Sequence, residues 1–342
     1  MTASPRLPAN PAGATCATGP TGPTGATGRR PPAARPARGA ALLVALVLLT
    51  VVATLASGMV WQQWKGVQVE SAERSRAQSA WVLQGALDWA RLILREDARS
   101  GRATSLNEPW ATPLAEARLS TFLATDTANN SDAGPEAFLA GSIQDAQARY
   151  NLRNLLVDGK VAPKQLAILQ RLCISAGLGS GIASQLADGL LAATLAKDSA
   201  APLPPQQLAD LAWLGIDAAS IHRLASVVGL LPVRTTVNLN TASREVLAGV
   251  VAGLDLGGAD RLVQARTRQP FRNLAEAGDV LGKGVTLEAG NVDVKSVYFE
   301  VQGRLRLAQR LLTERTLIER KSNLDVLAVA RLRQAGLVPT VP

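Results

Sequence analysis

The stretch RPARGAALLVALVLLTVVATLASGMVWQQW, residues 35–64, decides the plan of this chain. It sets basic residues directly against an uncharged run from Ala40 to Val60. A helix of about 20 apolar residues crosses the hydrocarbon core of a bilayer, whereas the core of a secretory signal usually has about 7–15. The stretch therefore predicts a transmembrane helix at 40–60.

The two flanks of this span predict its orientation. Arginines and no acidic residues occupy positions 29–39, and Trp61 and Trp64 follow the span. Basic residues favour the cytoplasmic side of a membrane, and tryptophan favours the interface between lipid and water. We expect the chain after Trp64 to lie outside the cytoplasm.

A cleaved signal peptide is the alternative, because small residues in LASGM (55–59) could suit a signal peptidase. The long apolar core and the lack of an A-x-A pattern argue against it. No proline interrupts residues 61–97, and apolar residues continue at helical spacing, at Val82, Ala86, Trp89 and Ile93. We expect one helix from the span through an amphipathic continuation at 61–98.

Neither the net charge nor the two cysteines indicate a particular binding partner or a disulfide. The 342 residues carry a formal charge of +9, but residues 1–39 hold five arginines and no acid, which leaves +4 from Ala40 onward. Glycine at every third position from Gly19 to Gly28 predicts a disordered leader. Without that leader Cys16 is lost, and Cys173 reads as a buried apolar residue.

Basic residues, one glycine, an apolar span and a continuing helix resemble the N-terminus of type IV pilins and type II secretion pseudopilins. The resemblance implies that prepilin peptidase cleaves after Gly39, leaving Ala40 as a methylated first residue. The family usually has glutamate at the fifth mature position, where this chain has Val44. The K component is the pseudopilin that lacks this acid, which implies a place at the fibre tip.

Polar motifs further along also resemble K-type pseudopilins. Asp145 precedes an aromatic-Asn-Leu-x-Asn run that contains Asn151 and Asn154. The run YNLRNLL at 150 has an echo in VNLNTAS at 237, which contains Asn238 and Asn240. Each is followed by an apolar helix, a glycine-rich turn and a second helix, so we interpret the region as two related helical halves.

The resemblance implies an α+β chain, a pilin-like fold with a large all-helical insertion and a C-terminal antiparallel sheet. Within its α/β part we expect a short helix near Leu114 to Leu123. The expected parts are a leader at 1–39, a transmembrane helix at 40–60, its amphipathic continuation at 61–98, a pilin α/β part at 99–156, the helical insertion at 157–289 and the C-terminal β part at 290–335.

As function, the resemblance implies a minor pseudopilin at the tip of the type II secretion pseudopilus, assisting export of folded proteins across the outer membrane. The implied location is the inner membrane of a Gram-negative bacterium, with one span and a periplasmic body. The implied partners are minor pseudopilins of the I, J and H types, the inner-membrane secretion platform and prepilin peptidase.

The alternative is a membrane-bound DNA-binding protein of competence type, because 237–281 resembles helix-hairpin-helix modules. In those modules hairpin amides meet a phosphate. Here Asp255 stands where a second glycine is expected, and the first hairpin, GLGSG at 177–181, has no Lys or Arg between Arg171 and Lys197. DNA binding needs several basic contacts, so we expect no nucleic-acid partner.

Catalytic and metal motifs are weak. His222 is the single histidine, which makes neither a zinc site nor a triad, so we expect no enzyme. K-type members can bind calcium, and the carboxylates that could serve here are Asp126, Asp132 and Asp145. Because no dense acidic loop surrounds them, we favour solvated carboxylates and no cofactor, and leave the metal ligands open.

Overall fold

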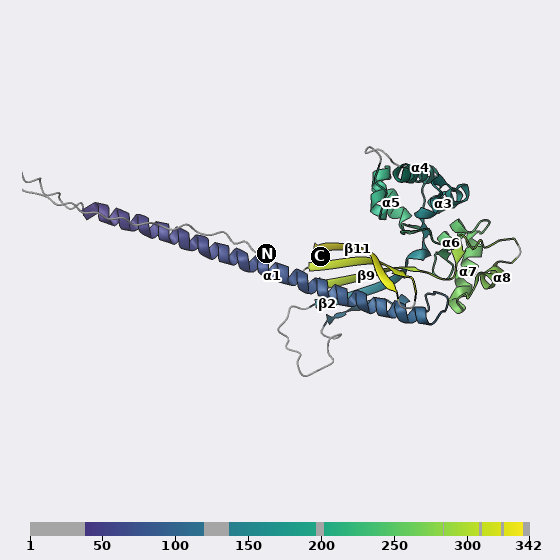
Figure 1. Cartoon of the computed structure of the whole chain (residues 1–342), viewed down its shortest axis with the longest axis horizontal. Coiled ribbons are helices and arrows are strands. Elements are labelled where there is room, and N and C mark those ends of the chain that lie inside the picture. Colours follow the sequence, from purple (N-terminus) through teal and green to yellow (C-terminus); the bar gives the residue numbers. More distant parts are fainter. Residues whose placement is uncertain are drawn as a thin grey trace, which may run out of the picture. The chain divides into compact units, whose positions relative to one another are not determined.

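The computed structural model describes residues 38–119, 137–195, 202–282, 284–307, 310–322 and 325–337. The chain divides into two compact units, Met1–Val69 and Glu70–Pro342. Helix α1 (Arg38–Arg99) has residues in both units (Figure 1). Residues 1–37 of the expected leader lie outside the part of the chain that the structure describes.

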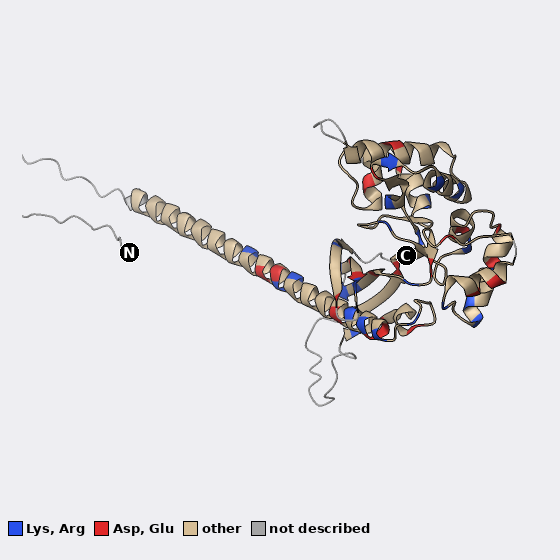
Figure 2. Ribbon diagram, turned by 45° about the vertical axis from the view of Figure 1, so that its right-hand side comes forward, with Lys and Arg blue, Asp and Glu red and all other residues tan. Residues whose placement is uncertain are grey.

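The α1 residues of the first unit are apolar and uncovered. Every side chain from Ala40 to Val69 is exposed, and Leu42 and Leu49 each expose 70% of their surface. No charged residue occurs between Ala40 and Trp64, as the tan part of α1 in Figure 2 shows. By length and composition α1 can cross a membrane.

In the second unit, α1 buries one stripe against a β-sheet. Its buried apolar positions are Leu83, Leu87, Ala90 and Leu94, none more than 4% exposed. The apolar stripe predicted from the sequence, through Val82 and Trp89, is one residue before the stripe that is buried. Trp89 remains 54% exposed. One residue turns a helix by about 100°, so the sheet contacts the leucine-rich side and leaves the indole at the edge.

The sheet has five antiparallel strands in the order β1-β2-β9-β10-β11. Three of them form the expected C-terminal part, and period-two alternation of apolar and polar side chains explains why they are strands. Figure 1 shows these strands beside α1. The predicted α+β fold class is confirmed. The strands are β1 (Leu114–Arg118), β2 (Ala137–Asp145), β9 (Tyr298–Leu307), β10 (Arg310–Arg320) and β11 (Val326–Leu337).

The helix expected near Leu114 to Leu123 is wrong for residues 114–118, which form strand β1. These residues pair with β2, with Leu114 opposite Gly141 and Arg118 opposite Phe138. Pairing to a sheet edge here outweighs the helix propensity of alanine and glutamate. Residues 120–123 lie outside the described part of the chain.

Two paired glycines in the sheet beneath α1 line a cavity. Gly141 of β2 pairs with Gly303 of β9, and Gly303 pairs with Glu314 of β10. Both glycines line a cavity of about 520 Å³ between α1 and the sheet, with Trp89 at its wall. A Cβ at position 303 would lie 3.1 Å from Leu83 Cδ2, so glycine lets the helix approach the sheet.

The segment between β2 and β9 is mostly helical. Its core contains Leu169, Leu172, Leu186, Leu211 and Leu247, each fully buried. Cys173 is buried in the same core, and burial raises the pKa of its thiol to about 11. The helices are η1 (Pro109–Ala111) before the sheet, then η2 (Ala146–Ala148), η3 (Leu152–Leu155), α3 (Pro163–Ser175), α4 (Gly181–Leu195), η4 (Leu208–Leu214), α5 (Ala218–Leu224), α6 (Arg244–Val250), α7 (Leu256–Arg268) and α8 (Leu274–Leu281).

Short strands frame both halves of this helical segment. In the first, β3 pairs in parallel with β6 after the intervening helices, and in the second, β7 pairs in parallel with β8 in the same way. A small antiparallel pair, β4 with β5, precedes α3. These strands are β3 (Tyr150–Asn151), β4 (Leu156–Val157), β5 (Lys160–Val161), β6 (Val228–Gly229), β7 (Val237–Asn238) and β8 (Val292–Asp293).

Gly249 allows α6 to pack against α3, which predicts the effect of adding one methyl group. A Cβ at position 249 would lie 2.3 Å from Leu172 Cδ2. Because overpacking a core costs about 1–3 kcal/mol, we expect Gly249→Ala to lower the free energy of unfolding by that amount. Urea denaturation of the detergent-purified chain measures it.

The matched control is Gly278→Ala in α8, where an added Cβ meets nothing within 4 Å. Alanine is favoured over glycine inside a helix by about 1 kcal/mol, so this change should leave stability equal or raise it. Equal destabilisation by both changes would contradict the packing explanation.

Candidate functional site

The expected cleavage position lies at the start of α1. Gly39 and Ala40 follow its first residue, Arg38, and Val44 is 58% exposed on the same helix. The first carboxylate of α1 is Glu70, in the second unit. The apolar part of the helix therefore offers neither acid nor internal partner, and its exposed side chains suit lipid or another apolar helix.

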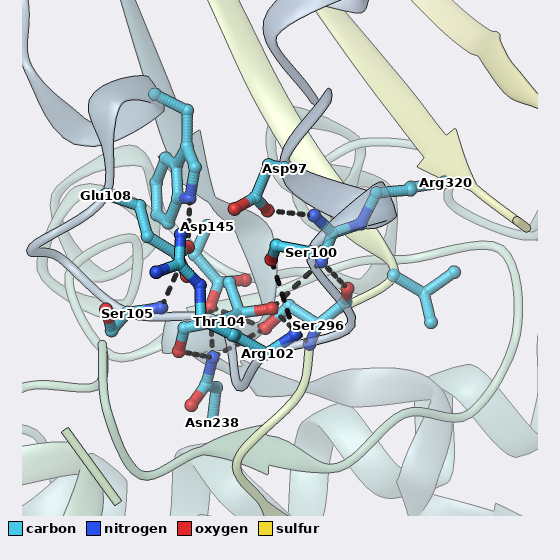
Figure 3. A network of polar contacts seen from close by, with 12 residues as sticks. Asp97, Ser100, Arg102, Thr104, Ser105, Glu108, Asp145, Asn238, Ser296 and Arg320 are labelled. Atoms are coloured by element: carbon cyan, nitrogen blue, oxygen red, sulfur yellow. Dashed lines mark hydrogen bonds and ion pairs between the residues drawn. The ribbon is translucent and has the colours of Figure 1, made fainter. Parts of the chain in front are cut away.

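Two of the motif residues, Asp145 and Asn238, meet elsewhere, at the end of β2 (Figure 3). The Oδ2 atom of Asp145 accepts hydrogen bonds from Asn238 Nδ2 at 2.9 Å and from the hydroxyl groups of Thr241 and Ser296 at 2.6 Å each. Its Oδ1 atom accepts from the backbone N–H of Gln147 at 2.8 Å. Four donors thus surround one buried carboxyl group.

Burial raises the pKa of Asp145, although the four hydrogen bonds act in the opposite direction. A buried charge is costly unless hydrogen bonds or an opposite charge compensate it. The whole of Asp145 is only 4% exposed. Its surroundings are thus built to hold an acceptor away from water rather than to present it to a ligand.

Asn238 connects the helical segment to the loop after α1. Its fully buried Nδ2 also contacts Ser296 Oγ at 2.8 Å and the carbonyl of Thr104 at 3.1 Å. Thr104 Oγ1 in turn accepts from the backbone N–H of Ser296. The loop after α1, the β7 region and the segment before β9 are therefore held together by one amide.

Arg320 of β10 joins the same network to the C-terminal end of α1. Its guanidinium forms an ion pair with Asp97 and donates to Thr104 Oγ1 and to the carbonyl of Ser296, both at 2.9 Å (Figure 3). The group also lies 4.6 Å from the centre of the Phe299 ring. Both members of the ion pair are at most 10% exposed, so losing one would leave a costly unpaired charge.

Glu108 also stabilises the loop after α1 through hydrogen bonds within that loop. Its carboxylate accepts from Trp110 Nε1 at 2.6 Å and from the backbone N–H of Ser105 at 3.2 Å. Burial raises the pKa of Glu108, and these hydrogen bonds partly offset that rise. The Trp110 ring then packs edge-to-face on Phe299, with ring centres 5.3 Å apart.

Two further motif asparagines clamp the backbone of distant residues. Asn154 donates to the carbonyl of Thr235 at 2.8 Å and accepts from its N–H at 3.1 Å. Asn240 does the same to Phe271, with both distances 2.9 Å. Each side-chain amide replaces a neighbouring peptide group, as a β-strand partner would.

Asn151 and Asn238 occupy equivalent places at the start of their turns. The Oδ1 of Asn151 accepts from the N–H of Arg153 at 3.1 Å, and the Oδ1 of Asn238 accepts from the N–H of Asn240 at 2.9 Å. Asn151 also accepts from Leu231 and donates to the carbonyl of Val233. Asn151, Asn154, Asn238 and Asn240 therefore act as structural acceptors and donors.

Of the three carboxylates considered as calcium ligands, only Asp145 belongs to the described part of the chain. Asp126 and Asp132 lie outside the described part of the chain, whereas Asp145 is buried and hydrogen-bonded, so the interpretation of Asp145 as a solvated carboxylate is wrong. Burial at the end of β2, where the helical segment begins, is the reason. Among the described residues, no three His, Cys, Asp or Glu side chains gather as a metal site would require.

The two hairpins of the DNA-binding alternative differ from a phosphate site. Asp255 Oδ1 accepts from the N–H of Gly258 at 2.7 Å, and so occupies an amide that an anion would use. At the first hairpin, Arg223 from α5 donates to the carbonyl of Gly177 at 3.3 Å. The sequence did not indicate this arginine, because it comes from another helix. His222, its neighbour, is exposed on α5.

Other members of the network were also absent from the sequence prediction. Thr104, Ser296 and Arg320 belong to no repeated pattern, and the chain brings them together from segments that are far apart. The one available signal was the dense asparagine motif, because buried amides need polar partners. Identifying those partners required the fold.

Asp145→Asn tests the network. An amide can keep one acceptor but turns an N–H₂ group toward the N–H of Gln147 or toward the hydroxyl donors, so we expect a loss of about 2 kcal/mol in unfolding free energy. Since the folded pKa of Asp145 is raised, its contribution is complete below the unfolded pKa and declines as pH rises through the folded pKa. The loss should therefore shrink from acidic toward alkaline pH.

Urea denaturation at several pH values measures this difference. Exposed Asp279→Asn is the control and should change stability by less than about 0.5 kcal/mol at every pH. A pH-independent effect of Asp145→Asn, or one no larger than that of the control, would contradict the assigned role.

Two of the buried motif residues lie within a match to a known protein family. A family model described as Type II secretion system (T2SS), protein K, matches residues 237–295, which include Asn238 and Asn240. Type II secretion system protein K of Pseudomonas aeruginosa is 28% identical over 319 residues, covering 84% of this chain and 90% of that protein.

The fold has a solved counterpart in the crystal structure of the GspK-GspI-GspJ complex from the enterotoxigenic Escherichia coli type 2 secretion system. The similarity has a TM-score of 0.58 at 17% identity, and it covers 77% of this chain and 98% of the other. At that identity the likeness concerns the fold alone. The sequence matches confirm the recognition made from the motifs: the chain is similar to type II secretion system protein K over most of its length, and its fold agrees with this.

Proposed function

We propose that this chain is a minor pseudopilin at the tip of a type II secretion pseudopilus, where it assists export of folded proteins across the outer membrane. One observation carries the proposal. An exposed apolar helix begins beside Gly39, and the same helix, α1, continues into the core of an α+β body. A subunit made this way can be inserted in a membrane and then assembled through the helix that anchored it.

The proposed location is the inner membrane of a Gram-negative bacterium, with one span and the second unit in the periplasm. The arginine-rich flank before the span supports this orientation, because basic residues favour the cytoplasmic side. Trp61 and Trp64, exposed after the span, suit the opposite interface.

Val44 supports the tip position. In related fibres a glutamate at this place pairs with the terminal amine of a neighbouring subunit, and a carboxylate without such a partner is costly in lipid. A capping subunit has no neighbour above it. The expected helical insertion at 157–289 adds bulk that would obstruct a subunit stacked above.

The proposed partners are minor pseudopilins of the I, J and H types, the secretion platform and prepilin peptidase. The fold relative from Escherichia coli was crystallised in a complex named GspK-GspI-GspJ, which motivates the first two. We propose assembly rather than catalysis, because the polar groups of the Asp145 network are engaged with one another.

Processing at Gly39 is the direct test of this function. In cells with prepilin peptidase, intact-mass and N-terminal peptide analysis should give a chain that begins at Ala40, with the added mass of a methyl group. Gly39→Ala should block cleavage and leave the leader attached. A start at Met59 or an intact leader in the wild type would contradict the pseudopilin assignment.

Val44→Glu tests the tip position separately. The introduced carboxylate would lie at membrane depth without an amine above it, at a cost of several kcal/mol unless protonated. We expect inefficient assembly, measured by crosslinking to other minor pseudopilins and by secretion of an exported protein.

Val44→Gln is the matched control, since it adds a polar group of the same size without a charge, and its effect should be smaller. Normal assembly of Val44→Glu, together with crosslinks that repeat this subunit along the fibre, would contradict the tip position even if cleavage occurs at Gly39.

A further inference from the structure

The two edges of the five-stranded sheet differ in how they are protected. Edge strand β1 has five residues, an irregular register after Leu114 and charged side chains at Glu116 and Arg118. Shortness, irregularity and charge are the usual means of preventing another strand from pairing with an edge. The opposite edge, β11, is twelve residues long.

Most of β11 forms a regular, open edge. Its register with β10 shifts once near Val329 and then runs without interruption from Ala330 to Leu337. Every residue from Ala330 to Gly336 is exposed, and Leu332 exposes 41% of its surface. This stretch contains no proline and no acidic residue. Within the described residues, β10 is the only strand paired with it.

The charge on β11 restricts what could pair there. Arg331 and Arg333 form ion pairs with one carboxylate, Glu314 of β10, at 3.2 and 2.6 Å. Two guanidiniums share one buried acid, which leaves an excess positive charge on the edge. Arg310 and Arg315 of the adjacent β10 add to it, although Arg315 approaches Glu300 at 4.0 Å.

A second copy of this chain is a poor partner for this edge. Two β11 strands paired antiparallel would bring their arginines together, and like charges on paired strands are destabilising. An extended segment with glutamate or aspartate would instead meet opposite charge. Backbone pairing to an open edge supplies affinity, and side-chain complementarity supplies selection.

We propose that Ala330–Leu337 of β11 is a docking edge that accepts an acidic, extended segment of a different protein as a sixth strand of the sheet. This interface does not involve the apolar residues 40–64 of α1, although Arg331 donates to Gln84 further along that helix at 2.9 Å, and it does not depend on the tip position. It gives the second unit a way to bind a partner outside the membrane.

The test uses the detergent-solubilised full chain and a fluorescent synthetic peptide of alternating glutamate and valine. Fluorescence anisotropy should show saturable binding that weakens with salt. A peptide with lysine in place of glutamate should bind at least tenfold more weakly. An acidic peptide with N-methylated backbone amides should also bind at least tenfold more weakly, because it keeps its charge but cannot complete a strand.

Position 334 provides a matched pair of variants, since Gln334 is exposed and does not contact Glu314 in the way the arginines do. Gln334→Glu should weaken binding of the acidic peptide severalfold, and Gln334→Lys should strengthen it. Equal binding of the N-methylated peptide would overturn strand addition. Equal binding to both variants, or self-association of the chain blocked by Gln334→Lys, would overturn the proposed acidic partner.

Discussion

The buried carboxyl group of Asp145 requires hydrogen-bond donors, and the fold supplies them from segments that share no local structure. Asn238 and Thr241 come from the helical segment, and Ser296 comes from the approach to β9. Leaving such a group unpaired costs several kcal/mol, so each segment is held in place by the same requirement. The hydrogen bonds to this one acid therefore join the helical segment to the sheet, beside the ion pair of Arg149 with Glu300 and the packing of Leu231 on Tyr298.

Helix α1 is continuous, but its two parts have different surroundings. Up to Val69 its side chains are exposed and largely apolar, while from Leu83 to Leu94 a stripe is buried against the sheet. Each fully buried leucine contributes about 1.5–3 kcal/mol, so the second part is stabilised by its own sheet. The first part gains comparable stabilisation only from lipid or from another helix, which is the physical basis of the proposed role in a membrane-anchored fibre.

Periodicity was sufficient to predict α1, the helical segment and the C-terminal strands, because apolar spacing of 3.6 or 2 residues reports which face will be buried. It failed where a tertiary contact decided the outcome: Leu114–Arg118 became a strand by pairing with β2, and the sheet selected the stripe next to the one containing Trp89. The asparagine motif was visible in the sequence, but its partners Thr104 and Arg320 were not. Single hydroxyl and guanidinium groups carry no pattern until the chain brings them together.

The ion pair between Asp97 and Arg320 joins residues that are 223 positions apart. The core of the helical segment, by contrast, draws its buried side chains from residues between Tyr150 and Val294. During synthesis from the N-terminus, domains fold as their residues emerge. The inserted helices can therefore complete their core before β10 is available, and the sheet can close only when almost the whole chain has emerged. Closure of that ion pair thus marks the completion of the polypeptide.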